Sequence, residues 1–421
     1  MTEKNKKKTQ DSWSRMNASD VKASEKFNAG YIAFLSRVKT EREAVAYISE
    51  EALSRGFKEI NQIKSLKPGD KLMIKLKSKA LFKTHYYGGI KKYQWLAIPL
   101  ALHGVVAKKD GRIIEICIGE KADDPVFTIA DLLPHLAKDQ MEKKMAEAIS
   151  GESLNAILGG RPLNDKDEEA IKARLMGILK DQYDIEEDDF TSAELQLVPA
   201  FPARELGLDR SMIAAYGQDD RVSAYASLMA ILEMDKPEKS AMCLFVDKEE
   251  IGSSGNTGLQ SLLIENVFAE LMNKAGRKDY FSLRQALANS AAISADVNAA
   301  VDPNYPEVFE KMNCSFLSRG VVVTKYTGSR GKYDSNDANP EFMARIRKIF
   351  DDAGVVWQVG ELGKVDIGGG GTVAQYIARY GMEVVDCGVA LLGMHSPFEV
   401  ASKADTYMSY KGYRAFLQNF I

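Results

Sequence analysis

Four short motifs carry the carboxylate and imidazole groups that could do chemistry in this sequence. They are Gln218-Asp219-Asp220-Arg221, Asp247-Lys248-Glu249-Glu250-Ile251-Gly252, Ser294-Ala295-Asp296 and Gly393-Met394-His395-Ser396. Two of them follow segments that we expect to be strands, and open α/β sheets usually bind ligands at strand ends. Carboxylate oxygens and imidazole nitrogens are common ligands of Zn²⁺, Mn²⁺ and Co²⁺. The motifs together therefore predict a site for divalent metal ions.

The adjacent pair Glu249 and Glu250 suggests what such a site would do. In extended chain, neighbouring side chains point to opposite sides, so one carboxylate can bind a metal while the other approaches a water molecule. This division of labour suits hydrolysis. Each motif alone also has a structural explanation, such as a helix cap, a solvated surface or a turn. Only their order and placement favour the catalytic interpretation.

Alternating strands and helices must position these motifs in the second half of the chain. From about Leu206 we expect strands at Met242–Val246, Val321–Lys325, Val355–Val359 and Glu383–Asp386, and helices at Val222–Glu233, Leu259–Lys274, Glu341–Asp352 and Thr372–Tyr380. This alternation predicts an α/β fold with a mostly parallel sheet. Residues 84–205 have strands and helices of their own and could form a separate lobe.

Composition narrows the class of protein. The 421 residues carry a formal charge of −3, which argues against nucleic acid or a membrane surface as the main partner. We find no apolar stretch of about 18 residues and no signal-peptide pattern at the N-terminus. The four cysteines are scattered without the spacing of a metal site or a disulfide scaffold. We therefore expect a cytoplasmic protein.

Over nearly its whole length the sequence resembles the M18 family of metallo-aminopeptidases, and within it the bacterial branch. The most specific stretches are Lys83–Trp95 (KTHYYGGIKKYQW), Asp247–Ser253 (DKEEIGS), Ser294–Asp296, Asp302–Tyr305 (DPNY) and Gly393–Ser396 (GMHS). The resemblance implies a zinc-peptidase-like catalytic domain over residues 1–83 and 206–421. A smaller β-rich assembly domain, residues 84–205, would interrupt it. It also implies a homo-oligomer, commonly a dodecamer, that acts on peptides.

The resemblance also assigns roles to the motif residues. Asp219 would bridge two divalent metal ions, with Asp220 behind it. Glu250 and His395 would bind one ion, and Asp296 the other. Glu249 would be the general base. Zinc is the first candidate for both ions, with manganese or cobalt as alternatives.

Two further residues are candidates for substrate binding. His135 could reach the active site of a neighbouring subunit, or could be an ordinary histidine at a helix end. Lys325 could bind a substrate carboxylate, or could be a surface lysine whose stem lies along apolar neighbours.

One family motif is missing. The family carries an early His-x-Asp motif, whose histidine is a metal ligand, on a strand that should lie between Lys71–Lys77 and Thr84. Here the chain runs straight from Lys75 to Thr84 without it. Either a segment between about Lys77 and Phe82 is missing from the printed residues, or the chain truly lacks it and one metal is short of a ligand. We favour the first explanation, because losing a central strand would expose sheet edges.

The missing motif leaves rival functions open. The chain could be a non-catalytic, self-assembling scaffold with an impaired metal site. It could also be a metal-dependent deacylase that uses the same residues on N-acyl substrates. Measurements of metal content and of activity on peptide and N-acyl substrates would distinguish an aminopeptidase, a scaffold and a deacylase.

Overall fold

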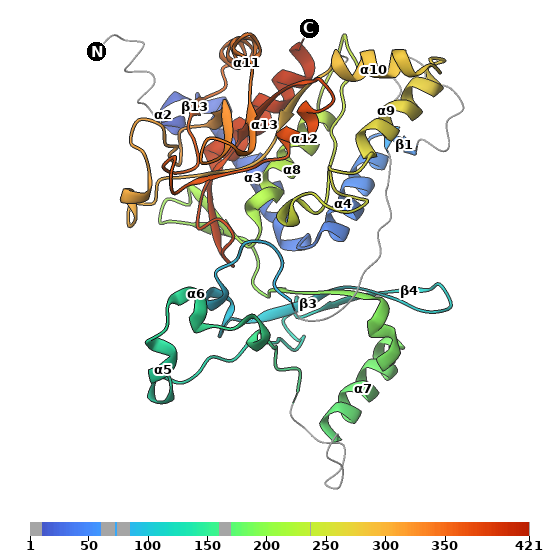
Figure 1. Ribbon diagram of the computed structural model, residues 1–421, viewed down its shortest axis with the longest axis vertical. Coiled ribbons are helices and arrows are strands. Elements are labelled where there is room, and N and C mark those ends of the chain that lie inside the picture. Colours follow the sequence, from blue (N-terminus) through green and yellow to red (C-terminus); the bar gives the residue numbers. More distant parts are fainter. Residues whose placement is uncertain (1–10, 60–71, 74–84, 160–169, 236, 421) are drawn as a thin grey trace.

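The structure is a computed structural model that describes residues 11–59, 72–73, 85–159, 170–235 and 237–420. Figure 1 shows two parts, an upper part of sheets covered by helices and a lower part that contains β3, β4 and α5 to α7. The residues on either side of the expected boundary at 83/84 include some outside the described ranges, so that boundary stays a prediction.

Three helices begin the upper part, α2 (Ser12–Arg15), α3 (Ala18–Arg37) and α4 (Glu41–Ser54). Asn17 caps α3 by accepting a hydrogen bond from Asp20 N. Thr40 and Glu43 form a capping box at the start of α4, which fixes the bend between the two helices. The buried face of α3 packs against Tyr225 of α8 (Gln218–Leu232) through aromatic contacts of Phe27, Tyr31 and Phe34.

Two mixed sheets lie at the centre of the upper part. The first has the strand order β13 (Trp357–Val359), β10 (Val321–Thr324), β15 (Glu383–Gly388), β8 (Ala291–Ser294). The second has the order β6 (Arg204–Leu206), β7 (Met212–Ala215), β17 (Glu399–Ser402), β16 (Ala390–Leu392), β9 (Asn298–Ala299). Both contain parallel and antiparallel pairs. Smaller sheets are formed by β12 (Tyr333–Asp337), β11 (Tyr326–Ser329) and β14 (Gly369–Gly370), and by β1 (Lys58–Glu59) with β2 (Leu72–Met73).

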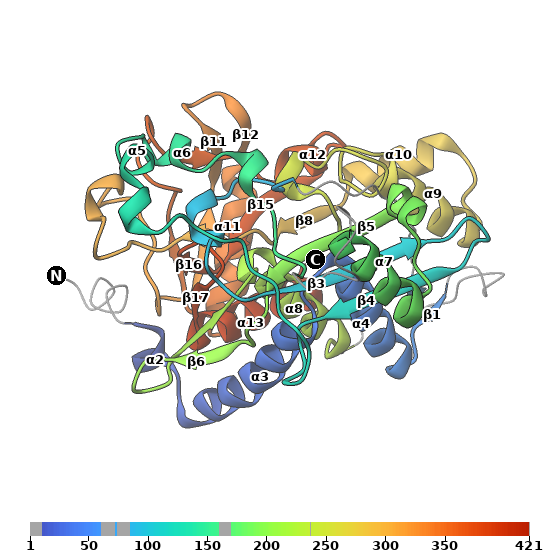
Figure 2. The same ribbon diagram turned by 90° about the horizontal axis from the view of Figure 1, so that it is seen from below.

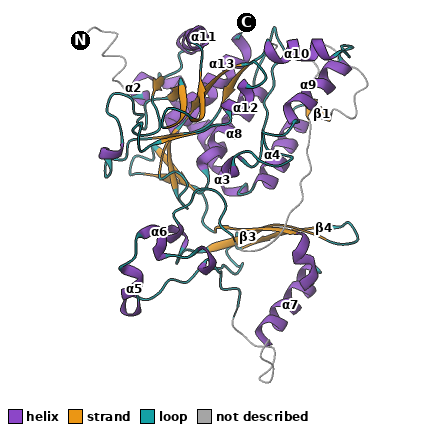
Figure 3. Ribbon diagram, in the orientation of Figure 1, coloured by secondary structure: helices purple, strands orange, loops and turns teal. Residues whose placement is uncertain are grey.

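The main core lies between the first sheet and its helices. The long C-terminal helix α13 (Lys403–Asn419) packs against α8 (Gln218–Leu232) and α11 (Pro340–Asp352), as Figure 3 shows. Buried side chains of this core include Val323, Phe342, Ile346 and Phe350. A second, smaller core forms around α9 (Leu263–Lys274), α10 (Tyr280–Ala288) and α12 (Ala374–Ala378).

The lower part is built on an antiparallel sheet of β4 (Ile113–Ile118), β3 (Leu100–Ala107) and β5 (Ala193–Pro199). The short helices α5 (Lys138–Met141) and α6 (Met145–Ala148) and the longer α7 (Ala170–Tyr183) belong to the chain between β4 and β5. Figure 1 shows this sheet below α3 and α4, and Figure 2 shows it from the opposite side of the sheet, with β3, β4 and β5 side by side. The chain returns from β5 to the upper part through β6.

The α/β class is confirmed, but one predicted strand is wrong. Residues 242–246 form no regular strand. A strand exists only where a neighbour completes its hydrogen bonds. Among the described residues none pairs with this segment, and β8 stands at the end of its sheet.

Candidate metal centre

Asp219 and His395 are held next to each other by one buried glutamate. Asp219 lies at the start of α8, and His395 lies in the turn between β16 and β17. Glu399, only 1% exposed, accepts hydrogen bonds from the backbone N–H of Asp219 at 3.0 Å and from that of His395 at 2.7 Å. Burial raises the pKa of Glu399 to about 8. One side chain therefore aligns two backbones that are far apart in the sequence.

His395 presents one ring nitrogen to carboxylates. Its Nδ1 lies 2.7 Å from the carbonyl oxygen of Gly89, which can only accept, so Nδ1 carries the hydrogen. Nε2 then faces Asp219 Oδ2 at 3.0 Å and Glu250 Oε1 at 3.4 Å. A histidine that donates through one nitrogen and offers the other is the usual form of a metal ligand.

The glycine pair Gly88 and Gly89 brings the start of the lower part against this cluster. A Cβ atom added to Gly88, which has a φ of +69°, would lie 2.6 Å from Glu250 Oε2. A Cβ at Gly89 would lie 3.3 Å from His395 Nδ1. At Gly88 only glycine allows this approach, and a side chain at Gly89 would require the His395 ring to shift. The tyrosine-glycine motif thus packs directly on two of the candidate ligands.

Two groups of candidate ligand atoms share Asp219. One ligand atom from each of Asp219, Glu250 and His395 lies within 4.8 Å of the others, and the same holds for Asp219, Asp220 and Asp296. Asp296 follows the end of β8, and Glu250 lies in the short 3₁₀ helix Glu249–Ile251. The structure therefore brings together the four residues that the sequence singled out. The second group has only carboxylate oxygens, as expected when the early histidine is missing.

The clustered carboxylates shift one another's pKa values. Burial and then the carboxylate of Asp219 raise the pKa of Asp296 well above its usual range. Burial, followed by the charges of Glu250 and Asp219, raises the pKa of Glu249 to about 7. Such crowding of like charges is unfavourable unless a cation is bound among them. The donor set therefore fits divalent metal ions.

The nearest arginine does not supply the missing positive charge. The Arg221 guanidinium donates to the backbone carbonyls of Gly217, Leu35 and Tyr216 rather than to the carboxylates. Lys248 pairs with Asp247 at 2.7 Å. Both Lys248 and His395 adopt left-handed backbone conformations, with φ of 71° and 63°. Non-glycine residues in this region often mark functional sites.

The two predicted substrate-binding residues lie outside this cluster. His135 is exposed on the short 3₁₀ helix Pro134–Leu136 of the lower part. Lys325, between β10 and β11, forms an ion pair with Asp337 and is half-exposed. Neither has a recorded contact with the four clustered residues, so their roles stay predictions.

Glu399 is a residue of the centre that the sequence motifs did not indicate. The signal was available, because Glu399 is the only charged residue at the start of the apolar strand β17 and follows His395 by four residues. A charged residue in a buried strand usually has a specific partner.

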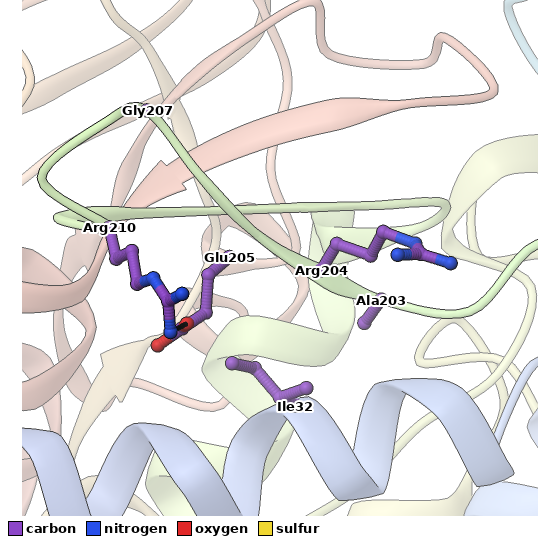
Figure 4. A pocket seen from close by; sticks show the side chains of 6 residues that line it. All are labelled: Ile32, Ala203, Arg204, Glu205, Gly207 and Arg210. Carbon is purple, nitrogen blue, oxygen red and sulfur yellow. Dashed lines mark hydrogen bonds and ion pairs between the residues drawn. The ribbon is translucent and has the colours of Figure 1, made fainter.

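A separate surface hollow of about 410 Å³ has no part in this centre. Figure 4 shows its lining residues, Ile32, Ala203, Arg204, Glu205, Gly207 and Arg210, between α3 and the β6–β7 turn. Arg210 pairs with Glu205 at 3.3 Å, and Glu205 also accepts a hydrogen bond from Lys403. None of the candidate metal ligands lines it.

Comparison with known proteins identifies relatives over the whole chain. "Probable M18 family aminopeptidase 1" of Clostridium acetobutylicum is 48% identical over 432 residues, covering 92% of this chain and 93% of that protein. The crystal structure of an M18 aminopeptidase from Thermotoga maritima matches with a TM-score of 0.91 and 43% identity, covering 97% of this chain and 99% of that one. The S. cerevisiae mApe1 dodecamer structure has the same fold, with a TM-score of 0.67 and 20% identity over 94% of this chain and 97% of that one.

The alignments also bear on the missing motif. The Clostridium alignment spans 432 positions, more than the 421 residues of this chain, so the relative has residues without a counterpart here. Residues 74–84, where the missing motif would end, lie outside the described residues. The family model for aminopeptidase I zinc metalloproteases (M18) matches residues 80–417, beginning where the motif would have ended. The chain therefore belongs to the M18 family of metal-dependent aminopeptidases.

Proposed function

We propose that this protein removes N-terminal residues from peptides with two divalent metal ions held by Asp219, Glu250, Asp296 and His395. The observation that carries the proposal is the position of Asp219 in both groups of ligand atoms, with Glu250 and His395 on one side and Asp296 on the other. Zinc is the metal of the family, and manganese or cobalt would also suit this donor set. When bound, the ions lower the pKa of a water molecule and polarise the scissile carbonyl.

Glu249 is the proposed general base. Its carboxylate lies beside the proposed ligands Asp219 and Glu250, where it can accept a proton from water and then return that proton to the leaving amine. The surrounding carboxylates attract the free α-ammonium group of a substrate, which favours cleavage at the N-terminus rather than within a chain. Lys325 would bind a substrate carboxylate in exchange for Asp337, and His135 would reach the site of a neighbouring subunit.

The lower part is the proposed assembly domain, residues 84–205, inserted between the catalytic segments 1–83 and 206–421. It exposes a run of large apolar side chains, and contiguous exposed apolar surface usually marks an interface. The members are Leu132, Leu133, Leu136, Met141 and Met145. We propose a second copy of this chain as the partner, in a closed homo-oligomer that could reach the dodecamer of the yeast protein.

The proposed location is the cytoplasm. All four cysteines are free, as expected in a reducing compartment. Within the described ranges, every helix is too short or too polar to cross a bilayer.

The experiment that tests this function is Glu249→Gln with metal analysis. We expect the variant to retain its divalent ions and to lose about 10²- to 10⁴-fold in kcat on aminoacyl substrates. Glu341→Gln, on the exposed start of α11, is the matched control and should keep full activity. Near-normal hydrolysis by Glu249→Gln would exclude Glu249 as the base. A wild-type chain without metal and without peptidase activity would favour the scaffold instead.

A further inference from the structure

Asp386 is a buried carboxyl group that lacks a partner. It lies in β15, between β10 and β8, and the residue is only 4% exposed. Both of its carboxylate oxygens are without a hydrogen bond in the described structure. Among the described residues no lysine, arginine or histidine forms an ion pair with it. An unpaired buried charge is costly, so something must balance it.

Three hydroxyl groups surround this carboxyl group. Ser294 lies directly opposite Asp386 in the parallel β8–β15 register, Thr327 lies on β11, and Thr372 precedes α12. Burial raises the pKa of Asp386 to about 6, and these three hydroxyls oppose the shift. The Ser294 and Thr327 hydroxyls are also buried and also lack a partner. Oxygen atoms from four segments thus lie close enough for the three hydroxyls to lower the pKa of Asp386, although none of them has hydrogen-bond geometry with its carboxylate.

We propose that Asp386, Ser294, Thr327 and Thr372 form a binding site for an alkali cation, sodium or potassium. The ligand atoms are all oxygens, which excludes the nitrogen and sulfur chemistry that transition metals favour. A single carboxylate balances one positive charge, whereas calcium and magnesium sites need more oxygen ligands or several carboxylates. The candidate ligand groups at the peptidase centre do not include any of these four residues.

Such a cation would join four separate segments. Ser294 ends β8 two residues before Asp296, and Thr327 lies on the β11–β12 hairpin. Thr372 begins the turn into α12 and accepts a hydrogen bond from Ala374 N at 3.3 Å. Binding at Asp386 would therefore hold the strand end that carries Asp296 in a fixed position. The inference does not depend on peptidase activity.

Thermal unfolding of the full chain tests the proposal. The protein is loaded with a fixed concentration of Zn²⁺ and melted in tetramethylammonium chloride, sodium chloride or potassium chloride at equal ionic strength. We expect sodium or potassium to raise the melting temperature of the wild type by about 2 °C or more, in a saturable way. Crystals soaked in thallium acetate should show anomalous density for Tl⁺ among the four oxygens.

Two variants and a control make the test specific. Asp386→Asn should melt at or above the wild type without alkali ions, because it removes the unpaired charge, and it should no longer respond to them. Ser294→Ala should weaken the response. Ser409→Ala removes a buried hydroxyl that is already bonded to Thr406 O, and it should respond like the wild type. Equal melting temperatures in all three salts, with no thallium density at Asp386, would overturn the proposal.

Discussion

Two histidines in this protein lie between two carboxylates, yet their surroundings differ in one respect. His103 of β3 contacts Glu43 at 2.7 Å and Glu120 at 3.0 Å, and His395 contacts Asp219 at 3.0 Å and Glu250 at 3.4 Å. At His103, Lys39 adds a second positive charge, with Nζ 2.7 Å from Glu120. At His395, the described residues supply no such cation.

The groups around His103 and His395 therefore differ in charge balance. Burial alone would lower the pKa of His103, but hydrogen bonds with Cys117, Glu120 and Glu43 raise it to about 11. Two positive and two negative side chains then neutralise each other across the junction of the upper and lower parts. The His395 group has surplus carboxylates and is 35% exposed at the histidine, so it remains open to ions from solvent. A histidine between two carboxylates is therefore part of a structural junction at His103 and of a candidate metal site at His395.

The largest expected effect comes from His395→Ala. Losing a candidate ligand should reduce kcat/KM by about 10³-fold, equal to about 4 kcal/mol of transition-state stabilisation, and remove about one equivalent of divalent metal. Steady-state kinetics and elemental analysis measure both. His103→Gln is the matched control and should keep its metal. If the His395→Ala protein kept its full metal content, His395 would not be a metal ligand and would not differ from His103 in this respect.

Lys39→Met should leave the group of His103, Glu43 and Glu120 with an excess of negative charge. Removing one partner of a buried ion network costs about 3 kcal/mol of unfolding free energy. Lys39 also donates to the carbonyl oxygens of Pro199 and Phe201, which would be left unpaired. Urea unfolding measures the loss. If charge balance explains the difference, Zn²⁺ should restore part of the stability of this variant while leaving the junction of the wild type unaffected.

The raised pKa of His103 should make the free energy of unfolding depend on pH. Its pKa is raised from about 6.5 in the unfolded chain to about 11 in the folded one. The folded state therefore keeps a proton that the unfolded state releases, so this contribution is complete below pH 6.5 and is lost as the pH rises toward 11. Unfolding free energies measured from pH 6 to 10 should fall less steeply in His103→Gln than in the wild type. If the unfolding free energy changed equally with pH in both proteins, His103 would not be held in its charged form by Glu43 and Glu120.

Glu399→Gln should loosen the candidate metal centre without removing a ligand. The amide keeps one acceptor oxygen but places an NH₂ group against a backbone donor, so we expect a loss of about 1–3 kcal/mol in stability. Metal affinity should fall about 10- to 100-fold, as for other residues that orient ligands. Isothermal titration with Zn²⁺ measures it. Unchanged affinity would show that Glu399 supports only the fold.

The smallest expected effect concerns the pair Arg42 and Glu194, which also links the upper and lower parts. Arg42 Nε lies 2.8 Å from Glu194 Oε1, and both side chains are about one-quarter exposed. Partly exposed pairs contribute about 0.5–1 kcal/mol. Glu194→Gln should therefore shift the urea midpoint only slightly, in contrast to Lys39→Met. An effect as large as that of Lys39→Met would show that burial is not what distinguishes the two links.

The sequence was most informative where chemistry is local. The Asp-Asp, Glu-Glu and His-Ser motifs indicated which side chains would converge, because strand ends of an α/β sheet meet at one edge. Glu399 and the carbonyl oxygen of Gly89 could not be found in this way, because their roles depend on contacts between distant segments. The strand expected at 242–246 failed for the same reason, since pairing requires a neighbour that local pattern does not reveal.

The glycine pair that packs on Glu250 and His395 has a mechanical consequence. Gly88 and Gly89 lie on the chain just before it enters the lower part, which is also the proposed contact with other subunits. Any rotation of that part pulls on a carbonyl oxygen that fixes the His395 ring. If the chain binds metal ions and assembles as proposed, retention of the ions would depend on the contacts between subunits. We then expect dilution of the proposed oligomer to release metal before the chain unfolds.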